Sequence, residues 1–116
     1  MSNIARHQSD SRLSRVVTHN GVVHIAGTTA DNRAAPMKGQ TEEVLKKIDA
    51  LLKVAGTDKS RLLSAVVYVS DMRLKPQMDE AWVAWMDPKN PPARATVETR
   101  LGTPDTLVEI MAIAAQ

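Results

Sequence analysis

The spacing of hydrophobic residues along the chain predicts strands in some segments and helices in others. Two short β-branched runs, at residues 15–19 and 22–27, flank the pair Asn20-Gly21. Both residues of an Asn-Gly pair tolerate the positive φ angles of a tight two-residue turn, so this segment is predicted to be a β-hairpin. The polar residues 28–37 that follow are predicted to be a loop.

Two later segments carry apolar residues at helical spacing. The first is predicted to be a helix over residues 41–55, with Thr41 as its N-cap and Gly56 just beyond its end. A second helix is predicted from Pro76, which suits a first helical turn, and is stopped by the three prolines within residues 87–92. The first helix presents one apolar stripe: Val44, Leu45, Ile48, Leu51, Leu52 and Ala55.

Three further segments are predicted to be strands. Residues 62–70 are β-branched and read as mostly buried, residues 93–101 alternate small or apolar with polar side chains, and residues 107–115 are almost wholly apolar. The turn-forming residues 102–106 lead us to expect the last two segments to be a strand pair. The predicted order is ββαβαββ, an α+β domain spanning residues 1–116 with two helices on one face of a mainly antiparallel sheet.

Several predicted strands are apolar on both sides, yet only two helices are available to cover the sheet. Association of the chain with further copies would bury the remaining face, so we expect an oligomer.

Composition and charge exclude several classes of function. The 116 residues include no cysteine, which rules out disulfides, a thiolate nucleophile and cysteine-bound metals. The net charge is only +2, and the basic residues are scattered, which argues against nucleic acid as a partner. No apolar stretch approaches the ~20 residues of a membrane span. Because the first ten residues are polar, we expect no secretory signal and a cytoplasmic location.

Two charged residues are candidates for chemistry. Glu109 is the only ionisable residue in the apolar run 107–115. A carboxylate there needs a partner, so it is either a structural ion pair with Arg94 or Arg100 or a functional group. Arg94 begins a strand, and its planar guanidinium suits a carboxylate ligand, although a solvated arginine on a sheet face would have the same spacing.

Other polar residues give weaker signals. His7, His19 and His24 lack metal-ligand spacing, and we expect no metal site. Gly27 ends a predicted strand, where it either presents a backbone amide to an anion or simply allows a bend.

The run Pro92-Ala-Arg-Ala-Thr-Val-Glu98, followed by Leu107-Val-Glu-Ile-Met-Ala-Ile-Ala114, resembles the C-terminal signature of the RidA/YjgF family of reactive-intermediate deaminases. The predicted hairpin, the first helix and the run Val67–Asp71 agree with that family in order and spacing. The short proline-rich connection before Arg94 resembles the YoaB-like branch.

The resemblance implies a chorismate-mutase-like fold, assembled as a homotrimer with ligand sites in clefts between subunits. In deaminating members of the family, an arginine at the position of Arg94 binds the substrate carboxylate and a glutamate at the position of Glu109 activates water. The positions of Gly27 and Thr96 contribute backbone contacts. No metal or organic cofactor is implied.

The chain departs from the family pattern around this expected pocket. Leu13 stands where many deaminating members carry a tyrosine, and Asp79 stands in place of an asparagine. Thr96 replaces a frequent cysteine, and Ala26 replaces a serine. The expected substrate-binding residues, Gly27, Thr96, Asp79 and Leu13, therefore give a pocket lining different from that of the deaminating members.

These observations lead to one main hypothesis and two alternatives. The main hypothesis is hydrolysis of imines or enamines, such as 2-iminopropionate and 2-aminoacrylate, to 2-keto acids and ammonium. A non-catalytic trimer that binds a small carboxylate or acts as a holdase is one alternative, and a pathway-specific deaminase acting on another imine is the second. RNA cleavage is disfavoured, since the chain lacks a basic stripe, aromatic stacking surface and a suitable histidine pair.

Overall fold

The computed structural model describes residues 3–116, which form six strands and two α-helices. The strands are β1 (Ala5–Ser9), β2 (Ser14–His19), β3 (Val22–Thr29), β4 (Leu62–Val69), β5 (Ala93–Glu98) and β6 (Val108–Ala115). The helices are α1 (Met37–Val54) and α2 (Lys75–Trp85). Each helix lies between two strands in the sequence, as the alternation of apolar spacings predicts.

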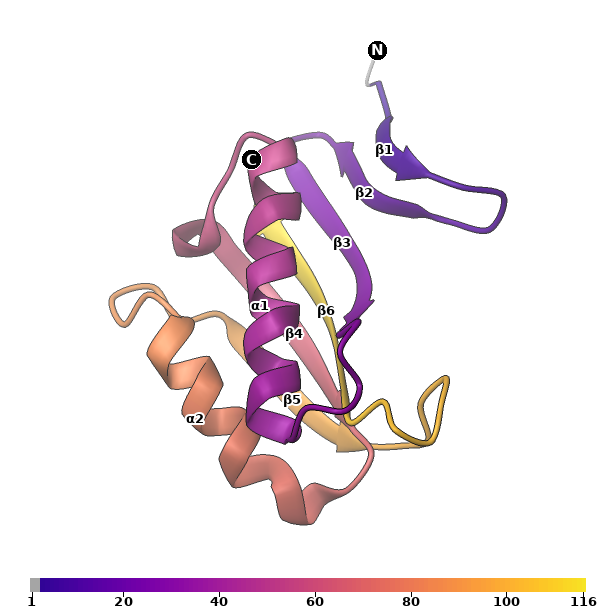
Figure 1. Ribbon diagram of the computed structural model, residues 1–116. Coiled ribbons are helices and arrows are strands. Elements are labelled where there is room, and N and C mark those ends of the chain that lie inside the picture. Colours follow the sequence, from indigo (N-terminus) through magenta and orange to yellow (C-terminus); the bar gives the residue numbers. More distant parts are fainter. Residues whose placement is uncertain (1–2) are drawn as a thin grey trace.

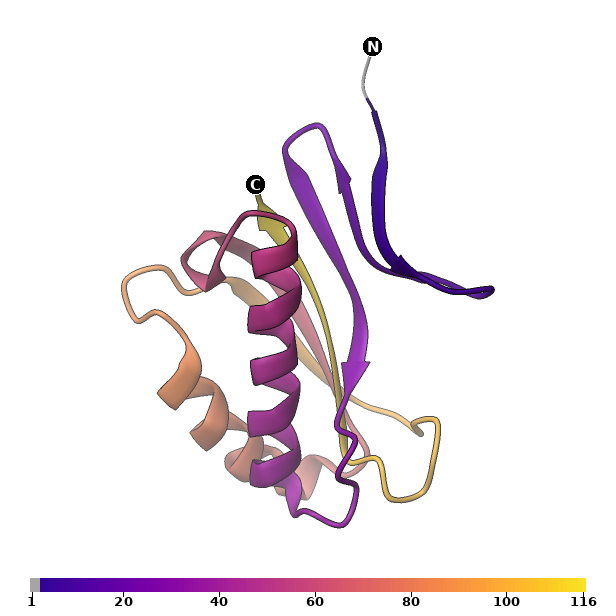
Figure 2. The ribbon, with the colours of Figure 1, turned by 45° about the horizontal axis from the view of Figure 1, so that its top comes forward.

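All six strands belong to one sheet, in the order β1-β2-β3-β6-β4-β5. Only β4 and β5 run parallel, and the other neighbours are antiparallel. Both helices lie on the same side of this sheet, and the opposite side is bare (Figures 1 and 2). The predicted α+β class, with two helices on one face of a mainly antiparallel sheet, is confirmed.

The strand β1 was not predicted from the sequence. It pairs with β2 at the edge of the sheet, so the order is βββαβαββ rather than ββαβαββ. Its side chains are mostly exposed on both faces. An edge strand that buries neither face has no alternation of apolar and polar residues, which is why the hydropathy pattern missed it.

The expected pairing of the last two strands is wrong. Strand β6 lies between β3 and β4, while β5 pairs in parallel with β4 at the far edge of the sheet. A parallel pair needs a crossover connection, and α2 supplies it between β4 and β5. The turn-forming residues before β6 therefore return the chain to the middle of the sheet instead of closing a hairpin.

Local signals located most element ends. Asn20 and Gly21 have φ angles of 52° and 75°, which confirms the predicted turn. Gly56, with φ 75°, ends α1 as expected. The predicted N-cap is wrong, because α1 already begins at Met37 and the Thr41 hydroxyl donates a hydrogen bond to the Met37 carbonyl oxygen, 2.8 Å away.

The hydrophobic core fills the space between the helices and the sheet. The apolar stripe of α1 packs there against inward side chains of β3, β4 and β6, including Val67 and Ile110. On the opposite face no helix covers the sheet, and Val97 and Met111 are 40% and 42% exposed. This bare face is where further copies of the chain are expected. Neither described helix has the length and apolar character needed to cross a membrane.

Candidate functional site

Arg94 lies near the start of β5, on the sheet face that carries the helices. Its partner in the register is Ala65 of β4, which is buried beneath α2 and α1. The guanidinium Nη2 lies 2.8 Å from Oδ1 of Asp79 on α2, and its carbon lies 5.2 Å from the centre of the Trp82 ring. With only 21% of its side chain exposed, Arg94 is not the solvated arginine that its spacing also allowed.

Asp79 joins Arg94 to a second cation. Its Oδ2 accepts a hydrogen bond of 2.6 Å from Lys75 Nζ, one turn earlier on α2. Burial raises the pKa of the Asp79 carboxyl, but contacts with Lys75 and Arg94 outweigh burial and hold that pKa below its ordinary value of 3.8. Asp79 is therefore ionised at neutral pH and balances part of the positive charge around Arg94.

Two buried oxygens in this region have no hydrogen-bond partner within residues 3–116: Oδ1 of Asp79 and Oγ1 of Thr96. An ion pair with Nη2 of Arg94, 2.8 Å away, nevertheless satisfies Oδ1 of Asp79. Thr96 lies two residues beyond Arg94 and so shares its sheet face. Oγ1 of Thr96 is thus the buried oxygen that has no polar partner among the described residues, which is uncommon in native proteins.

Glu109 lies on β6 with its side chain on the bare face of the sheet. It sits opposite Thr29 of β3 and Tyr68 of β4. The residue is half-buried, and within residues 3–116 its carboxylate makes no ion pair. The structural alternative, an ion pair with Arg94 or Arg100, is therefore not found in the single chain.

Gly27 makes room for this carboxylate. The register between β3 and β6 shifts between Ile25 and Thr28, and Gly27 lies in that irregular segment. A Cβ atom on Gly27 would overlap the carboxylate end of Glu109. Glycine therefore lets the Glu109 side chain lie directly on the backbone of the neighbouring strand.

A shallow hollow of about 310 Å³ opens beside Glu109. It is lined by Gly27, Tyr68, Thr99, Arg100, Leu101, Gly102, Glu109 and Met111. Arg100 is an exposed cation there, which the sequence suggested only as a salt-bridge partner. Arg100 lines the hollow because of the path that the loop takes after β5, and the sequence does not predict that path.

Within one chain the predicted site residues form two separate groups. Arg94, Asp79 and Thr96 lie together between β5 and α2, and Gly27 lies against Glu109 on the opposite face. The register explains the separation: Thr96 and Ile110 both pair with the buried Val67, so Glu109, next to Ile110, points the other way. Leu13 is exposed in the β1–β2 connection and does not line the hollow at Glu109.

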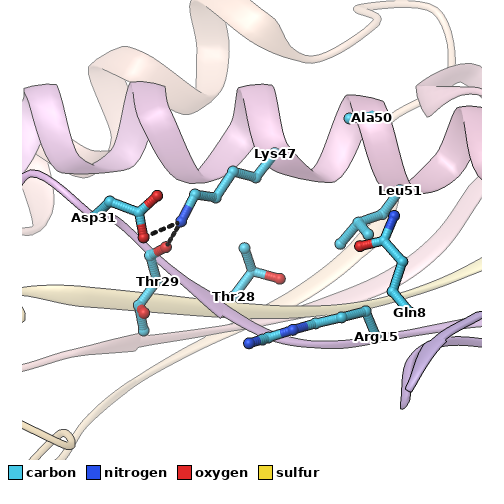
Figure 3. Close-up of a pocket in the computed structure, with 8 residues that line it drawn as sticks. All are labelled: Gln8, Arg15, Thr28, Thr29, Asp31, Lys47, Ala50 and Leu51. Atoms are coloured by element: carbon cyan, nitrogen blue, oxygen red, sulfur yellow. Dashed lines mark hydrogen bonds and ion pairs between the residues drawn. The ribbon is translucent and has the colours of Figure 1, made fainter. Parts of the chain in front are cut away.

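A second hollow, of about 340 Å³, lies between α1 and the ends of β1, β2 and β3 (Figure 3). Its lysine, Lys47, donates a 2.8 Å hydrogen bond to the Thr29 carbonyl oxygen and lies 2.9 Å from Oδ1 of Asp31. Lys47 thus links α1 to the end of β3, and its ammonium group already contacts groups of the same chain. Within the part of the chain that the structure describes, no three acidic, histidine or cysteine side chains are grouped to hold a metal ion.

Comparison with known proteins agrees with this architecture over nearly the whole chain. The sequence model of the family described as Endoribonuclease L-PSP matches residues 4–116. A RutC family protein of Haemophilus ducreyi is 39% identical over 112 residues, covering 97% of this chain and 96% of the relative. RutC family protein YoaB of Escherichia coli K12 is 36% identical over 112 residues, covering 97% of each chain.

A solved structure gives the same result. NMB1025 of Neisseria meningitidis, a member of the YjgF protein family, superposes with a TM-score of 0.96 at 36% identity, covering 98% of this chain and 95% of that one. The fold and the sequence similarity are consistent with one another. The chain belongs to the Endoribonuclease L-PSP family, the group that also contains the YjgF and RutC proteins.

Proposed function

We propose that this protein hydrolyses small imines of 2-oxo acids, and their enamine tautomers, to 2-oxo acids and ammonium. Imines of the 2-iminopropionate and 2-aminoacrylate type are the substrates we expect. The observation that carries the proposal is Glu109, a half-buried carboxylate without an internal counter-ion that lies against Gly27 beside an open hollow. A carboxylate that no protein cation neutralises is free to accept a proton from a water molecule.

Two copies of the chain would build each cleft. Arg94 and Glu109 lie on opposite faces of one sheet, so they can act on one small molecule only when they belong to different chains. The bare sheet face, with Val97 and Met111 exposed, offers an apolar surface for that association. The family resemblance implies a homotrimer, in which each chain would give Arg94 to one cleft and Glu109 to the next.

The chemistry follows from these two groups. Arg94 would hold the carboxylate of the substrate and orient its C=N carbon. Glu109 would take a proton from water as the oxygen attacks that carbon, and would return it to nitrogen so that ammonia leaves. The iminium acid and one water molecule thus become a 2-oxo acid and ammonium. The step needs no covalent intermediate, redox change or cofactor.

A second candidate, binding of a small carboxylate without turnover, is favoured by one observation. Arg94 and Glu109 lie on opposite faces of the sheet, so a carboxylate bound by Arg94 meets no base from the same chain. RNA cleavage, which the family's description names, draws little support from a formal net charge of +2 and an aromatic content of 3%.

A coupled assay tests the deaminase proposal. The protein is added to a serine or threonine dehydratase reaction, and release of the 2-oxo acid is followed with wild type and with Arg94→Ala. We expect wild type to accelerate release and the variant to lose most of that acceleration. Identical traces for the two proteins with several amino acids would contradict the proposal.

A mixing experiment tests the two-chain cleft. Arg94→Ala and Glu109→Gln, each expected to lose most of its activity when alone, are unfolded together and refolded. In a randomly assembled ring, each cleft takes Arg94 from one chain and Glu109 from the next, and each of these residues is intact in half of the chains. About a quarter of the clefts would therefore contain both intact residues and regain activity. If both residues of a cleft came from one chain, the mixture would stay inactive.

A further inference from the structure

We infer that Arg100 recognises a second carboxylate on the substrate, so that the cleft prefers imines of dicarboxylic 2-oxo acids to those of monocarboxylic ones. In this assignment Arg94 of one chain holds the carboxylate beside the C=N carbon, Glu109 of the next chain acts at that carbon, and Arg100 binds the far carboxylate. The inference rests on the proposed function, because it names the substrate class of that same site.

Arg100 is a cation without a counter-ion at the edge of the proposed site. It lies in the loop between β5 and β6, which projects from one end of the sheet (Figure 1). Its side chain is exposed, and within residues 3–116 it makes no ion pair. The planar guanidinium therefore has its fork of N–H donors available for a carboxylate.

The acidic residues at the two ends of this loop are engaged elsewhere. Oε1 of Glu98 accepts a 2.8 Å hydrogen bond from the backbone N–H of Met72, and Oδ1 of Asp105 lies 3.7 Å from Nε of Arg33. Neither carboxylate forms an ion pair with Arg100. The positive charge of Arg100 is therefore left to the solvent or to a ligand.

Two hollows meet at Arg100. One, of about 310 Å³, also contains Glu109, and the other, of about 600 Å³, follows the loop as far as Pro104. Residues 99–102 line both hollows, so the space beside Glu109 continues past Arg100. This continued space suits a ligand longer than 2-iminopropionate, with one end at Glu109 and the other beside Arg100.

Arg100 and Glu109 bring opposite charges to one hollow, yet no ion pair joins them. Glu109 therefore keeps its capacity to accept a proton, and Arg100 keeps its positive charge. A substrate with a second carboxylate would give Arg100 the counter-ion that Glu109 does not supply, whereas a monocarboxylic imine would leave Arg100 unpaired. Arg100 thus acts as a specificity-determining residue that reads the far end of the substrate.

Binding calorimetry with two stable 2-oxo acids tests the inference. 2-Oxoglutarate represents the dicarboxylate and pyruvate the monocarboxylate, and each is titrated into wild type, Arg100→Gln and Lys53→Gln. Lys53 is the matched control, because it is an exposed cation on α1 that makes no ion pair among the described residues. We expect wild type to bind 2-oxoglutarate about tenfold more tightly than pyruvate. Arg100→Gln should lose that preference by weakening 2-oxoglutarate binding alone, and Lys53→Gln should behave as wild type.

Three outcomes would overturn the inference: wild type binds the two probes equally, Arg100→Gln weakens both equally, or neither probe binds wild type. Arg100→Lys, which keeps the charge but not the planar fork, is expected to retain part of the preference. Turnover is measured separately, as ammonium release from the imines that an amino-acid oxidase forms from glutamate and alanine. Preferential binding of 2-oxoglutarate without turnover would refute the proposed deaminase activity and leave the role of Arg100 standing, whereas turnover with equal binding would do the reverse.

Discussion

Arg94 and Glu109 lie on opposite faces of one sheet and are held in opposite ways. Arg94 is fixed by its own chain: it pairs with Asp79, covers the Trp82 ring and is mostly buried. Glu109 has no counter-ion within residues 3–116. It has room to lie against β3 because Gly27 has no side chain. The cation is therefore preorganised and partly neutralised, while the carboxylate has no counter-ion among the described residues.

In the proposed function, this difference would separate binding from chemistry. A guanidinium held by a carboxylate and an aromatic ring loses little side-chain freedom when a ligand arrives, which favours accurate orientation. A carboxylate without a fixed partner keeps its capacity to accept and return a proton. Mutations on the Arg94 face should consequently lower the affinity for the ligand, whereas mutations on the Glu109 face should lower the rate of turnover.

The largest effect is expected from Glu109→Gln. The amide has nearly the same shape but cannot act as a base, so kcat in the dehydratase-coupled assay should fall by about 100-fold or more. The melting temperature should stay close to that of wild type, since the Glu109 side chain makes no ion pair with any residue that the structure describes. Glu42→Gln, on the exposed face of α1, serves as the control for loss of one negative charge. A large loss of stability in Glu109→Gln would show instead that this residue is structural.

A smaller effect is expected from Gly27→Ala. The added methyl group would meet the flexible end of Glu109 rather than backbone, so the carboxylate can swing aside at little cost. We expect about a tenfold loss of kcat from the misplaced base and a change in unfolding free energy below about 1 kcal/mol. In the background of Glu109→Gln, the same substitution should lower kcat no further. An additive loss in the double variant would mean that Gly27 acts independently of Glu109.

The smallest effect is expected from acid on the Arg94 face. Because the pKa of Asp79 is lowered in the folded chain, its contribution to stability is present above the ordinary value of 3.8 and is lost as pH falls through the lower folded value. Asp79→Asn should therefore melt below wild type at neutral pH, and the difference should shrink below about pH 3.8. Melting curves of the two proteins across this range measure it. A gap that persists unchanged at lower pH would contradict the ionised pair.

The contrast between the two faces also shows how much of the site was predictable. The sequence indicated Arg94 and Glu109 as candidates, because each is a charged residue in a segment whose neighbours are small or apolar, and their role stays a prediction. For Glu109 it left two alternatives open, a structural ion pair with an arginine or a functional role, and no such ion pair is found within residues 3–116. The Asp79–Arg94 pair was not predicted, because the register of α2 over β5 brings together residues that lie 15 positions apart in the sequence.

Local chemistry was enough to determine the elements themselves. The apolar stripe of α1, the turn at Asn20 and Gly21 and the glycine after α1 depend on residues within a few positions of one another. Such short-range preferences act in any context, so the sequence alone indicates a hairpin, two helices and the later strands. Strand β1 was missed, because a polar edge strand is recognised only through its pairing with β2.

Tertiary structure alone decided which strands are neighbours and which face each charged side chain occupies. Every strand offers the same backbone hydrogen bonds, so these bonds do not select its neighbours. Strand β6 lies between β3 and β4 because this order buries apolar faces beneath α1 and α2. A register different by one residue would place Glu109 in the core beneath those helices. The sequence thus determined which two charged residues are candidates for the proposed site, and long-range packing placed them on opposite faces of the sheet.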